Sequence, residues 1–526
     1  MKRISVYISS LLLAVAALTS CHKQLDRTPP NSLSSGNVYN SEAGYLQVLA
    51  KVYGSMALTG NQGPAGNGDV AGIDEGTSDF LRLFWKAQEL STDEAVVAWN
   101  DPGIQDFHNM NWSSSNPMTK GLYYRCTYII TLCNEFIRES NPATVGGRGI
   151  TGAAADNIKR MRAETRFVRA YAYWVLLDLY GKPGFTTEND PISKFNPPQT
   201  TRAALFSFIE TELKAIEADL SNARAGDYGR ADKGAAWALL ARLYLNAKVY
   251  IDTDKYTDAV TYSKRVIDAG YGLLSDYRWL GLADNNVNNP EFIWTLNYDG
   301  VKSKNFGGTT FLVNASVGGD MDRNVSGLGG WGGIRTTRNL PDLFPDVNGN
   351  GDKRAQFVTG TQNIEINNIS EFKDGLAVIK YRNRTRSGAF GQDPEKTFAD
   401  VDFPVFRLAE MYLIYAEAVK RGGTGGTEAQ ALIYLNALRA RAQVTAAPLG
   451  FYTLDYVLDE RARELYWEGF RRTDLIRYGR FTEGTYLWPW KGGVKTGAGV
   501  SANRKVYPIP DSEIAANPNL KQNDGY

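Results

Sequence analysis

The sequence has almost none of the side chains on which most metal and nucleophilic chemistry depends. Its 526 residues include only two histidines, His22 and His108, and three cysteines, Cys21, Cys126 and Cys133. Zinc sites and Ser-His or Cys-His catalysis need several such side chains held close together. We therefore expect no metal site and no catalytic site of these kinds.

An excess of charge is also missing. The chain has 58 Lys and Arg residues and 57 Asp and Glu residues, which gives a formal net charge of +1. Proteins that bind nucleic acid or an anionic membrane surface usually present a marked excess of Lys and Arg. We therefore expect no nucleic-acid partner.

The N-terminus predicts export followed by lipid anchoring. Lys2 and Arg3 precede an apolar run over residues 4–17, which is too short to span a membrane and is typical of a secretory signal. The next residues, Leu-Thr-Ser-Cys, resemble the bacterial lipobox and end at Cys21, so residues 1–20 are predicted to be a lipoprotein signal peptide. An ordinary signal peptide would leave Cys21 as an unpaired thiol, which is uncommon in exported proteins. Acylation of Cys21 would anchor the protein through lipid alone.

The mature chain is predicted to be one domain behind a short tether. Residues 21–35 are expected to form a lipidated, polar tether, and residues 36–526 a single α-helical domain. Two loop-rich insertions are expected in this domain, at about residues 60–112 and 279–402. Short β-like runs occur in the second insertion, at residues 292–298 and 377–381.

Residues 161–181 predict the central helix of that domain. Phe167, Tyr171 and Trp174 recur at helical spacing on one face, and Val168, Ala172 and Val175 make a second face apolar too. A helix that is apolar on two faces must be covered by other helices. This helix therefore predicts a scaffold for function elsewhere and no chemistry of its own.

Helix pairs account for much of the remaining scaffold. Residues 229–249 have the apolar spacing of the first helix of a tetratricopeptide repeat, and residues 256–269 supply a partner after an unusually long turn. Residues 406–421 and 427–442 look like a second pair. The predicted fold class is therefore mainly α, with tetratricopeptide-like helix pairs packed against a loop-rich ligand-binding region that has few short strands.

The first insertion has the composition of a sugar-binding surface. Residues 60–76 are rich in glycine but lack the Gly-Lys-Ser ending of a phosphate-binding loop. Residues 74–112 mix acids, amides and aromatic residues with little regular period. Aromatic faces stack on sugar rings, and amides or charged groups bond the hydroxyl groups. An irregular loop held by aromatic residues is the alternative interpretation.

Two charged stretches permit other interpretations. Residues 346–352 imitate the start of a calcium loop, but Phe357 stands where a bidentate Glu is needed, so a plain Asn-Gly turn is favoured. Calcium is the one cofactor that this leaves open. Residues 454–481 alternate in charge sign, which predicts a solvated face or an intramolecular ion-pair face.

Several of these segments together resemble the SusD/RagB family. The family consists of surface lipoproteins of Gram-negative bacteria that bind a nutrient, usually a glycan, and pass it to a SusC-like TonB-dependent outer-membrane transporter. The resemblance therefore implies a lipid-anchored protein exposed at the cell surface on the outer membrane, with no catalysis. Besides Cys21 its carriers are RAETRFVRAYAYWVLLDLYG, GRADKGAAWALLARLYLNAKVY, FPVFRLAEMYLIYAEA, RARELYWEGFRRTDLIRYGRF and YPIP.

Other segments are similar to the starch-binding members of that family, which implies an α-glucan ligand. They are DEGTSDFLR, ELSTDEAVVAW, DGVKSKNFGGTTFLV and YLWPWKGG. In those members three aromatic residues, an Arg and an Asn contact the glucan. By motif, two of the aromatic residues fall on Phe306 in KNFGGTT and on Trp331 in GGWGG, and the Arg falls on Arg82 in DFLRLF.

The rest of the family pattern matches less closely. The third aromatic position falls on Val97, which leaves only Trp99 nearby, and the amide is assigned to Asn100. Asp74, in the DEGTSDF segment, is expected to bond sugar hydroxyl groups. The glycan-binding residues predicted from the resemblance and the loop are therefore Phe306, Trp331, Trp99, Arg82, Asn100 and Asp74.

Two alternatives to glycan capture remain. Some members of the family resemble peptide capturers, so another nutrient could be the cargo. A glycoside hydrolase needs only two carboxyl groups, which Asp69, Asp74, Glu75 or Asp79 could supply. Acids in a glycine-rich loop more often accept hydrogen bonds or form turns, which favours binding without catalysis.

Overall fold

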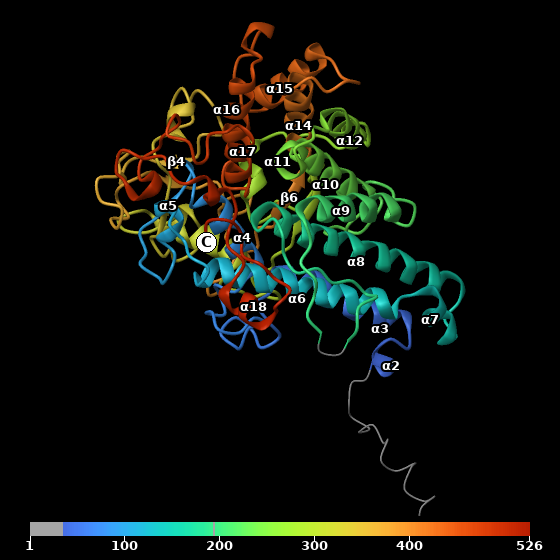
Figure 1. Cartoon of the computed structure of the whole chain (residues 1–526). Helices are drawn as coiled ribbons and strands as arrows, with labels where there is room; N and C mark the ends of the chain where they lie inside the picture. The colour runs from blue at the N-terminus through green and yellow to red at the C-terminus, as the bar shows by residue number, and fades with distance from the viewer. Residues whose placement is uncertain (1–34, 193–194) are drawn as a thin grey trace, which may run out of the picture.

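The computed structural model describes residues 35–192 and 195–526 (Figure 1). The signal peptide, the lipidation site Cys21 and the tether before Ser35 lie outside the described residues. Among the described residues, no helix is both long and apolar enough to cross a membrane.

Helix α8 (Gly152–Leu179) is the central helix, and it begins nine residues before the predicted start. Every residue from Phe167 to Leu179 is buried, which confirms that both faces are covered. Gly181 ends the helix in a left-handed conformation (φ 75°), and its N–H donates to the Leu176 carbonyl. Three helices pack along α8: α3 (Glu42–Ala57), α6 (Pro117–Glu139) and α9 (Arg202–Ile216).

The predicted helix pairs are present and stack side by side. Helix α10 (Lys233–Leu245) packs on α12 (Tyr256–Asp268), which packs on α14 (Leu408–Lys420), which packs on α15 (Glu428–Arg441). A short helix, α11 (Ala247–Ile251), occupies the long turn after α10. The fold is therefore mainly helical, as predicted.

Each of the two loop-rich insertions also contains a buried helix. Helix α4 (Phe80–Glu89) lies in the first insertion and α13 (Gly308–Ala315) in the second. Asp79 joins the starts of both helices, because its Oδ1 accepts from the Arg82 N–H and from the Gly308 N–H at 2.8 Å each. Both helices are buried on nearly every side, and α4 is buried although it carries the polar side chains of Lys86, Gln88 and Glu89.

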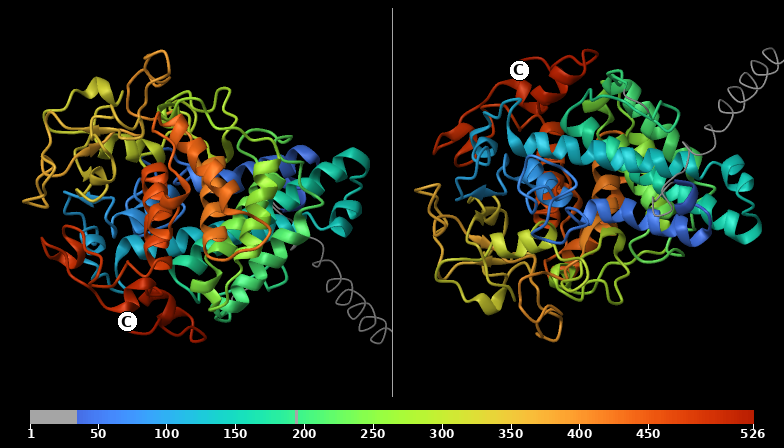
Figure 2. Two further views of the ribbon diagram at one scale, coloured as in Figure 1. Left: turned by 90° about the horizontal axis from the view of Figure 1, so that it is seen from above. Right: turned by 90° about the horizontal axis from the view of Figure 1, so that it is seen from below.

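The strands are short and lie mainly in the second insertion. Strand β2 (Phe292–Leu296) pairs antiparallel with β6 (Phe403–Arg407), so Phe406 belongs to a strand and not to the predicted helix. Two further antiparallel pairs are β1 (Val96–Val97) with β3 (Ile334–Arg335) and β4 (Phe357–Val358) with β5 (Ala377–Val378). Figure 2 shows the loops of this insertion gathered at the end of the molecule opposite α7 (Pro142–Gly147).

The remaining elements are short helices that connect or flank the layers. The α-helices are α2 (Ser35–Val38), α5 (Asp106–Asn109), α16 (Leu454–Leu465), α17 (Arg471–Arg477) and α18 (Asp511–Ala516). The 3-10 helices are η1 (Tyr277–Gly281), η2 (Arg323–Val325), η3 (Pro341–Leu343), η4 (Leu449–Phe451), η5 (Lys491–Gly493) and η6 (Ala502–Lys505).

The charged stretch at residues 454–481 is mostly buried, so the expectation of a solvated face was wrong and that of an intramolecular ion-pair face is confirmed. A turn separates α16 from α17, and within it Trp467 has a left-handed backbone with a φ of 64°. Glu464, on α16, is fully buried and its carboxylate lies 2.6 Å from Arg407 and 3.4 Å from Arg354. It also pairs with Arg441. These ion pairs tie α16 to β6 and α15.

The loop that imitates a calcium site forms a turn closed by its own side chains. The Asp346 carboxylate accepts from the Asn348 N–H at 2.9 Å and from the Asn350 side chain at 2.6 Å. These contacts match the plain Asn-Gly turn that the sequence favoured.

His108 makes stability depend on pH. Burial lowers the pKa of His108 to about 4, and the charge of Arg335 acts in the same direction. The unfolded chain takes up this proton near pH 6.5, so protonation of His108 favours unfolding as the pH falls from about 6.5 to about 4. Between pH 7.5 and pH 5, wild type should lose about 2 kcal/mol more unfolding free energy than His108→Gln. Urea titrations at both pH values measure this, and equal losses would contradict it.

Candidate functional site

The largest cavity that we describe has a volume of about 660 Å³ and lies where the first insertion meets the second. It brings together four of the six predicted glycan-binding residues: Asp74, Arg82, Phe306 and Trp331. Glu75, which also lines it, was considered only as a possible hydrolase acid. The other lining residues were not predicted; they are Ile73, Gly76, Thr77, Asp101, Pro102, Pro117 and Met118.

Phe306 is held in place by the loop that precedes α13. The neighbouring Asn305 donates its side-chain amide to Asp79 at 2.7 Å and to the Ala57 carbonyl at 3.0 Å. Gly76 faces Phe306, and a Cβ at Gly76 would lie 2.8 Å from the Phe306 Cβ. The absence of a side chain at Gly76 therefore lets the two loops approach and leaves the Phe306 ring half-buried at the cavity.

Arg82 extends from the first turn of α4 between aromatic rings. Its guanidinium lies 4.8 Å from the centre of the Phe311 ring and 5.9 Å from that of Trp331, and Nη1 donates to the Phe306 carbonyl at 3.1 Å. Burial lowers the pKa of Arg82, while the charges of Asp74 and Asp79 oppose that effect. In the described part of the chain its Nε finds no acceptor. Arg82 therefore retains a donor for a ligand.

Trp331 is the most exposed ring of the cavity, with 38% of its surface accessible. The backbone N–H of Trp331 donates to the Asn314 carbonyl at 2.6 Å, and that of Gly332 donates to the Val317 carbonyl at 2.8 Å. These bonds tie the Trp331 loop to the end of α13. The indole is thus presented to solvent on a fixed backbone, as ring stacking with a sugar requires.

Trp99 and Asn100 lie beside the cavity and do not line it. The Trp99 ring is 6.4 Å from Trp331 and 6.3 Å from Phe311, so it packs behind the exposed indole. Asn100 is exposed. Val97, at the third aromatic position of the family pattern, is completely buried in β1.

A buried lysine lies below the cavity and was not predicted. Lys86 is 1% exposed, and its Nζ contacts the sulfur of the lining residue Met118 at 3.7 Å. Burial holds the pKa of Lys86 well below its usual range, and the charge of Arg82 acts in the same direction. Among the described residues it has no carboxylate within ion-pair distance. Lys86 lies one turn after Arg82 on α4, so the two side chains are neighbours on the helix. This spacing is the sequence pattern from which Lys86 could have been predicted.

Three of the four acids considered for a hydrolase have structural partners, and one of them is Asp74, whose Oδ1 accepts from the Thr77 N–H at 2.8 Å. Asp69 pairs with Lys51 at 2.9 Å. Asp79 is completely buried and accepts from Asn305 and from two helix N-termini. Asp74 and Glu75 remain at the cavity, next to each other in sequence, and Asp101 is the third acid of its lining. Catalysis by two acids needs them on either side of the bond that breaks.

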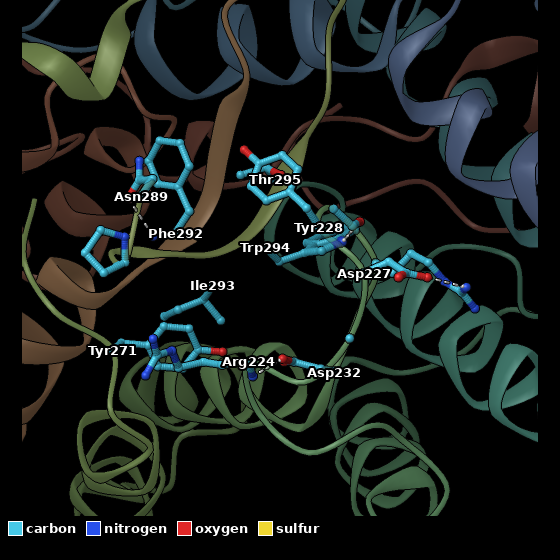
Figure 3. Close-up of a pocket in the computed structure, with 14 residues that line it drawn as sticks. Arg224, Asp227, Tyr228, Asp232, Tyr271, Asn289, Phe292, Ile293, Trp294 and Thr295 are labelled. Carbon is cyan, nitrogen blue, oxygen red and sulfur yellow. Dashed lines mark hydrogen bonds and ion pairs between the residues drawn. The ribbon is translucent and has the colours of Figure 1, made fainter. Parts of the chain in front are cut away.

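A second, smaller cavity of about 250 Å³ lies between the start of α10 and β2 (Figure 3). Most of its polar groups are already bonded to the protein, and the buried Tyr271 hydroxyl is the exception among the described residues. Asp232 caps α10 by accepting from the Ala235 N–H at 3.1 Å, the Trp294 indole donates to the Gly229 carbonyl at 3.2 Å, and Tyr228 donates to Asp402 at 2.8 Å. These bonds leave few groups free for a ligand, so the larger cavity is the better candidate.

Comparison with known proteins identifies the family to which the sequence is similar. A model of the SusD family matches residues 370–526, and a model described as starch-binding associating with outer membrane matches residues 107–245. The starch-binding protein SusD of Bacteroides thetaiotaomicron is 36% identical over 574 residues, which cover 100% of this chain and 99% of that protein.

Solved structures share the fold. Surface glycan-binding protein A from Bacteroides fluxus aligns with a TM-score of 0.68 at 22% identity and covers 92% of this chain and 100% of its own. A laminarin-binding SusD-like protein aligns with a TM-score of 0.67 at 22% identity and the same coverage. These alignments concern the fold alone, whereas the full-length relative is close enough in sequence to define the family. The chain therefore belongs to the SusD family.

Proposed function

We propose that this protein captures a glycan, with a starch-like α-glucan as the favoured ligand, and that it does no chemistry on it. The observation that carries the proposal is the exposed Trp331 ring beside Phe306 and Arg82 in one cavity. The rings offer two apolar faces to sugar C–H surfaces. Arg82, Asp74 and the neighbouring acids offer donors and acceptors for hydroxyl groups.

The relatives support a sugar ligand. One of them is named a starch-binding protein and is similar along the whole chain. The site differs from the family pattern in one respect, because Val97 stands at the third aromatic position and Trp99 lies behind Trp331, outside the cavity lining. We therefore assign Phe306 and Trp331 to stacking, Arg82 and Asp74 to hydroxyl binding, and Trp99 to support of Trp331. Asn100 is assigned to the rim, within reach of a longer chain.

Affinity electrophoresis tests the ligand class directly. Native gels that contain soluble starch, other α-glucans, laminarin or no glycan should retard the wild-type protein most strongly with α-glucan. Retardation by laminarin alone would replace the α-glucan assignment with a β-glucan. Failure on every glycan, together with binding to a peptide library, would favour a peptide-capturing protein. Release of reducing sugar that is lost in Asp74→Asn would show a hydrolase.

We also propose that acylated Cys21 anchors the protein on the outer surface of the outer membrane, beside a SusC-like TonB-dependent transporter. A binder that neither spans the membrane nor cleaves its ligand is useful only if a partner carries the ligand inward. Anchoring both proteins in one membrane raises their effective concentration. Co-purification from outer membranes in mild detergent, with a tag on this chain, should recover a large β-barrel partner. Recovery of the acylated protein alone would contradict the partnership.

A further inference from the structure

Another cavity of ligand size, which we call the arginine pocket, has a different chemical character from the glycan cavity. Its volume is about 550 Å³, which lies within the range of small-ligand sites. Four arginines line it, Arg278, Arg382, Arg384 and Arg386, and Asp322 is the one carboxylate among its lining residues. In a protein of net charge +1, this is a local concentration of positive charge.

Most of this charge is not neutralised by the protein. Arg278 pairs with Asp276. In the ranges 35–192 and 195–526, no carboxylate lies within ion-pair distance of the side chains of Arg382, Arg384 or Arg386. Burial lowers the pKa of Arg382, and the charge of Arg278 adds to this effect. An anion in the pocket would offset the mutual repulsion of these groups.

Two of the four arginines, Arg384 and Arg386, are positioned by aromatic stacking. The Arg384 guanidinium lies 4.0 Å from the centre of the Phe390 ring, and that of Arg386 lies 4.8 Å from the Trp279 ring. Stacking fixes the plane of a guanidinium while its N–H edge stays available. Arg386 spends one donor on the Val287 carbonyl at 2.8 Å, and its Nε is buried without an acceptor among the described residues, as is the Nε of Arg382. The pocket therefore holds oriented, unsatisfied donors.

We propose that the arginine pocket binds an anionic saccharide, in which a sulfate ester or carboxylate group is held by the guanidinium groups. Planar guanidinium groups form paired hydrogen bonds with oxyanions of this kind. Trp279, Asn324 and Thr385 complete the lining with an aromatic ring, an amide and a hydroxyl group, the side chains that contact sugars. The pocket is separate from the glycan cavity, because the two share no lining residue.

Native gels that contain dextran sulfate, polygalacturonate or neutral dextran test this assignment in the full-length mature protein. Dextran sulfate should retard the wild type, whereas neutral dextran should not. Arg384→Gln/Arg386→Gln should weaken the binding by roughly tenfold or more at about 0.15 M salt. Retardation by polygalacturonate would extend the site to carboxylates, and its absence would restrict the site to sulfate esters.

Matched variants separate the pocket from general charge effects. Arg160→Gln, on α8, removes one positive charge from an exposed arginine that has no carboxylate partner among the described residues, so its retardation should equal that of the wild type. Arg384→Lys keeps the charge but loses the planar fork and should bind more weakly than the wild type. Trp331→Ala should bind dextran sulfate normally. The proposal would be overturned by the absence of retardation by dextran sulfate, or by equal losses in Arg384→Gln/Arg386→Gln and Arg160→Gln.

Discussion

Replacement of both Trp331 and Phe306 by alanine is expected to lower the affinity for the favoured glucan by at least about thirtyfold. Each ring in a well-packed binding site contributes about 1 to 3 kcal/mol when it is removed, and a tenfold change corresponds to about 1.4 kcal/mol. Both rings line the same cavity, and the Arg82 guanidinium lies between the backbone of one and the ring of the other. Isothermal titration with a maltooligosaccharide measures the loss.

Two control variants show whether that loss arises from the cavity. Phe451→Ala removes a ring that is 61% exposed on η4 and lines none of the cavities considered above, so it should bind like the wild type. Phe306→Tyr keeps the stacking face and should retain binding. An affinity for the double variant within threefold of the wild type would remove these rings from the binding site.

The second large effect concerns the buried charges that hold the scaffold together. Glu464→Gln is expected to lower the free energy of unfolding by about 3 to 5 kcal/mol, because removal of one partner leaves buried charges without compensation. Burial alone would raise the pKa of Glu464, yet Arg441, Arg407 and Arg354 hold it well below its usual range. The glutamine has nearly the same shape but cannot balance these charges. Urea unfolding measures the difference.

A variant in a surface ion pair serves as the control for Glu464→Gln. Glu217→Gln removes the partner of Arg265, which lies 3.3 Å away, and both side chains are substantially exposed. Solvent screens such a pair, so the expected change is below about 1 kcal/mol. A loss for Glu464→Gln as small as that for Glu217→Gln would mean that the buried network contributes little to stability.

The same network shows that burial of charged residues could not be predicted from their order in the sequence. The alternating signs at residues 454–481 predicted either a solvated face or an internal one, because the spacing of charges along a chain does not say what covers them. The covering elements, β6 and α15, come from other parts of the chain and supply Arg407 and Arg441. Burial of the acids therefore depended on contacts that are distant in sequence.

The sequence alone determined the helical scaffold and identified four of the twelve residues that line the cavity. Two-sided apolar periodicity predicted α8, and repeat-like spacing predicted the stacked pairs. Arg82, Phe306 and Trp331 were identified through the resemblance of short motifs to the starch-binding members of the family. These signals are local, since each depends on residues a few positions apart.

Only the tertiary structure decided which of those residues share a surface. Phe306 lies 224 positions from Arg82 in sequence, yet its carbonyl accepts a hydrogen bond from that side chain. Trp99 was predicted to bind glycan as Trp331 was, but it lies behind Trp331. The arginine pocket likewise gathers Arg278 with Arg382, Arg384 and Arg386 from two separated loops. Local patterns fix helices because their hydrogen bonds are local, whereas a binding surface depends on long-range packing that a single sequence does not display.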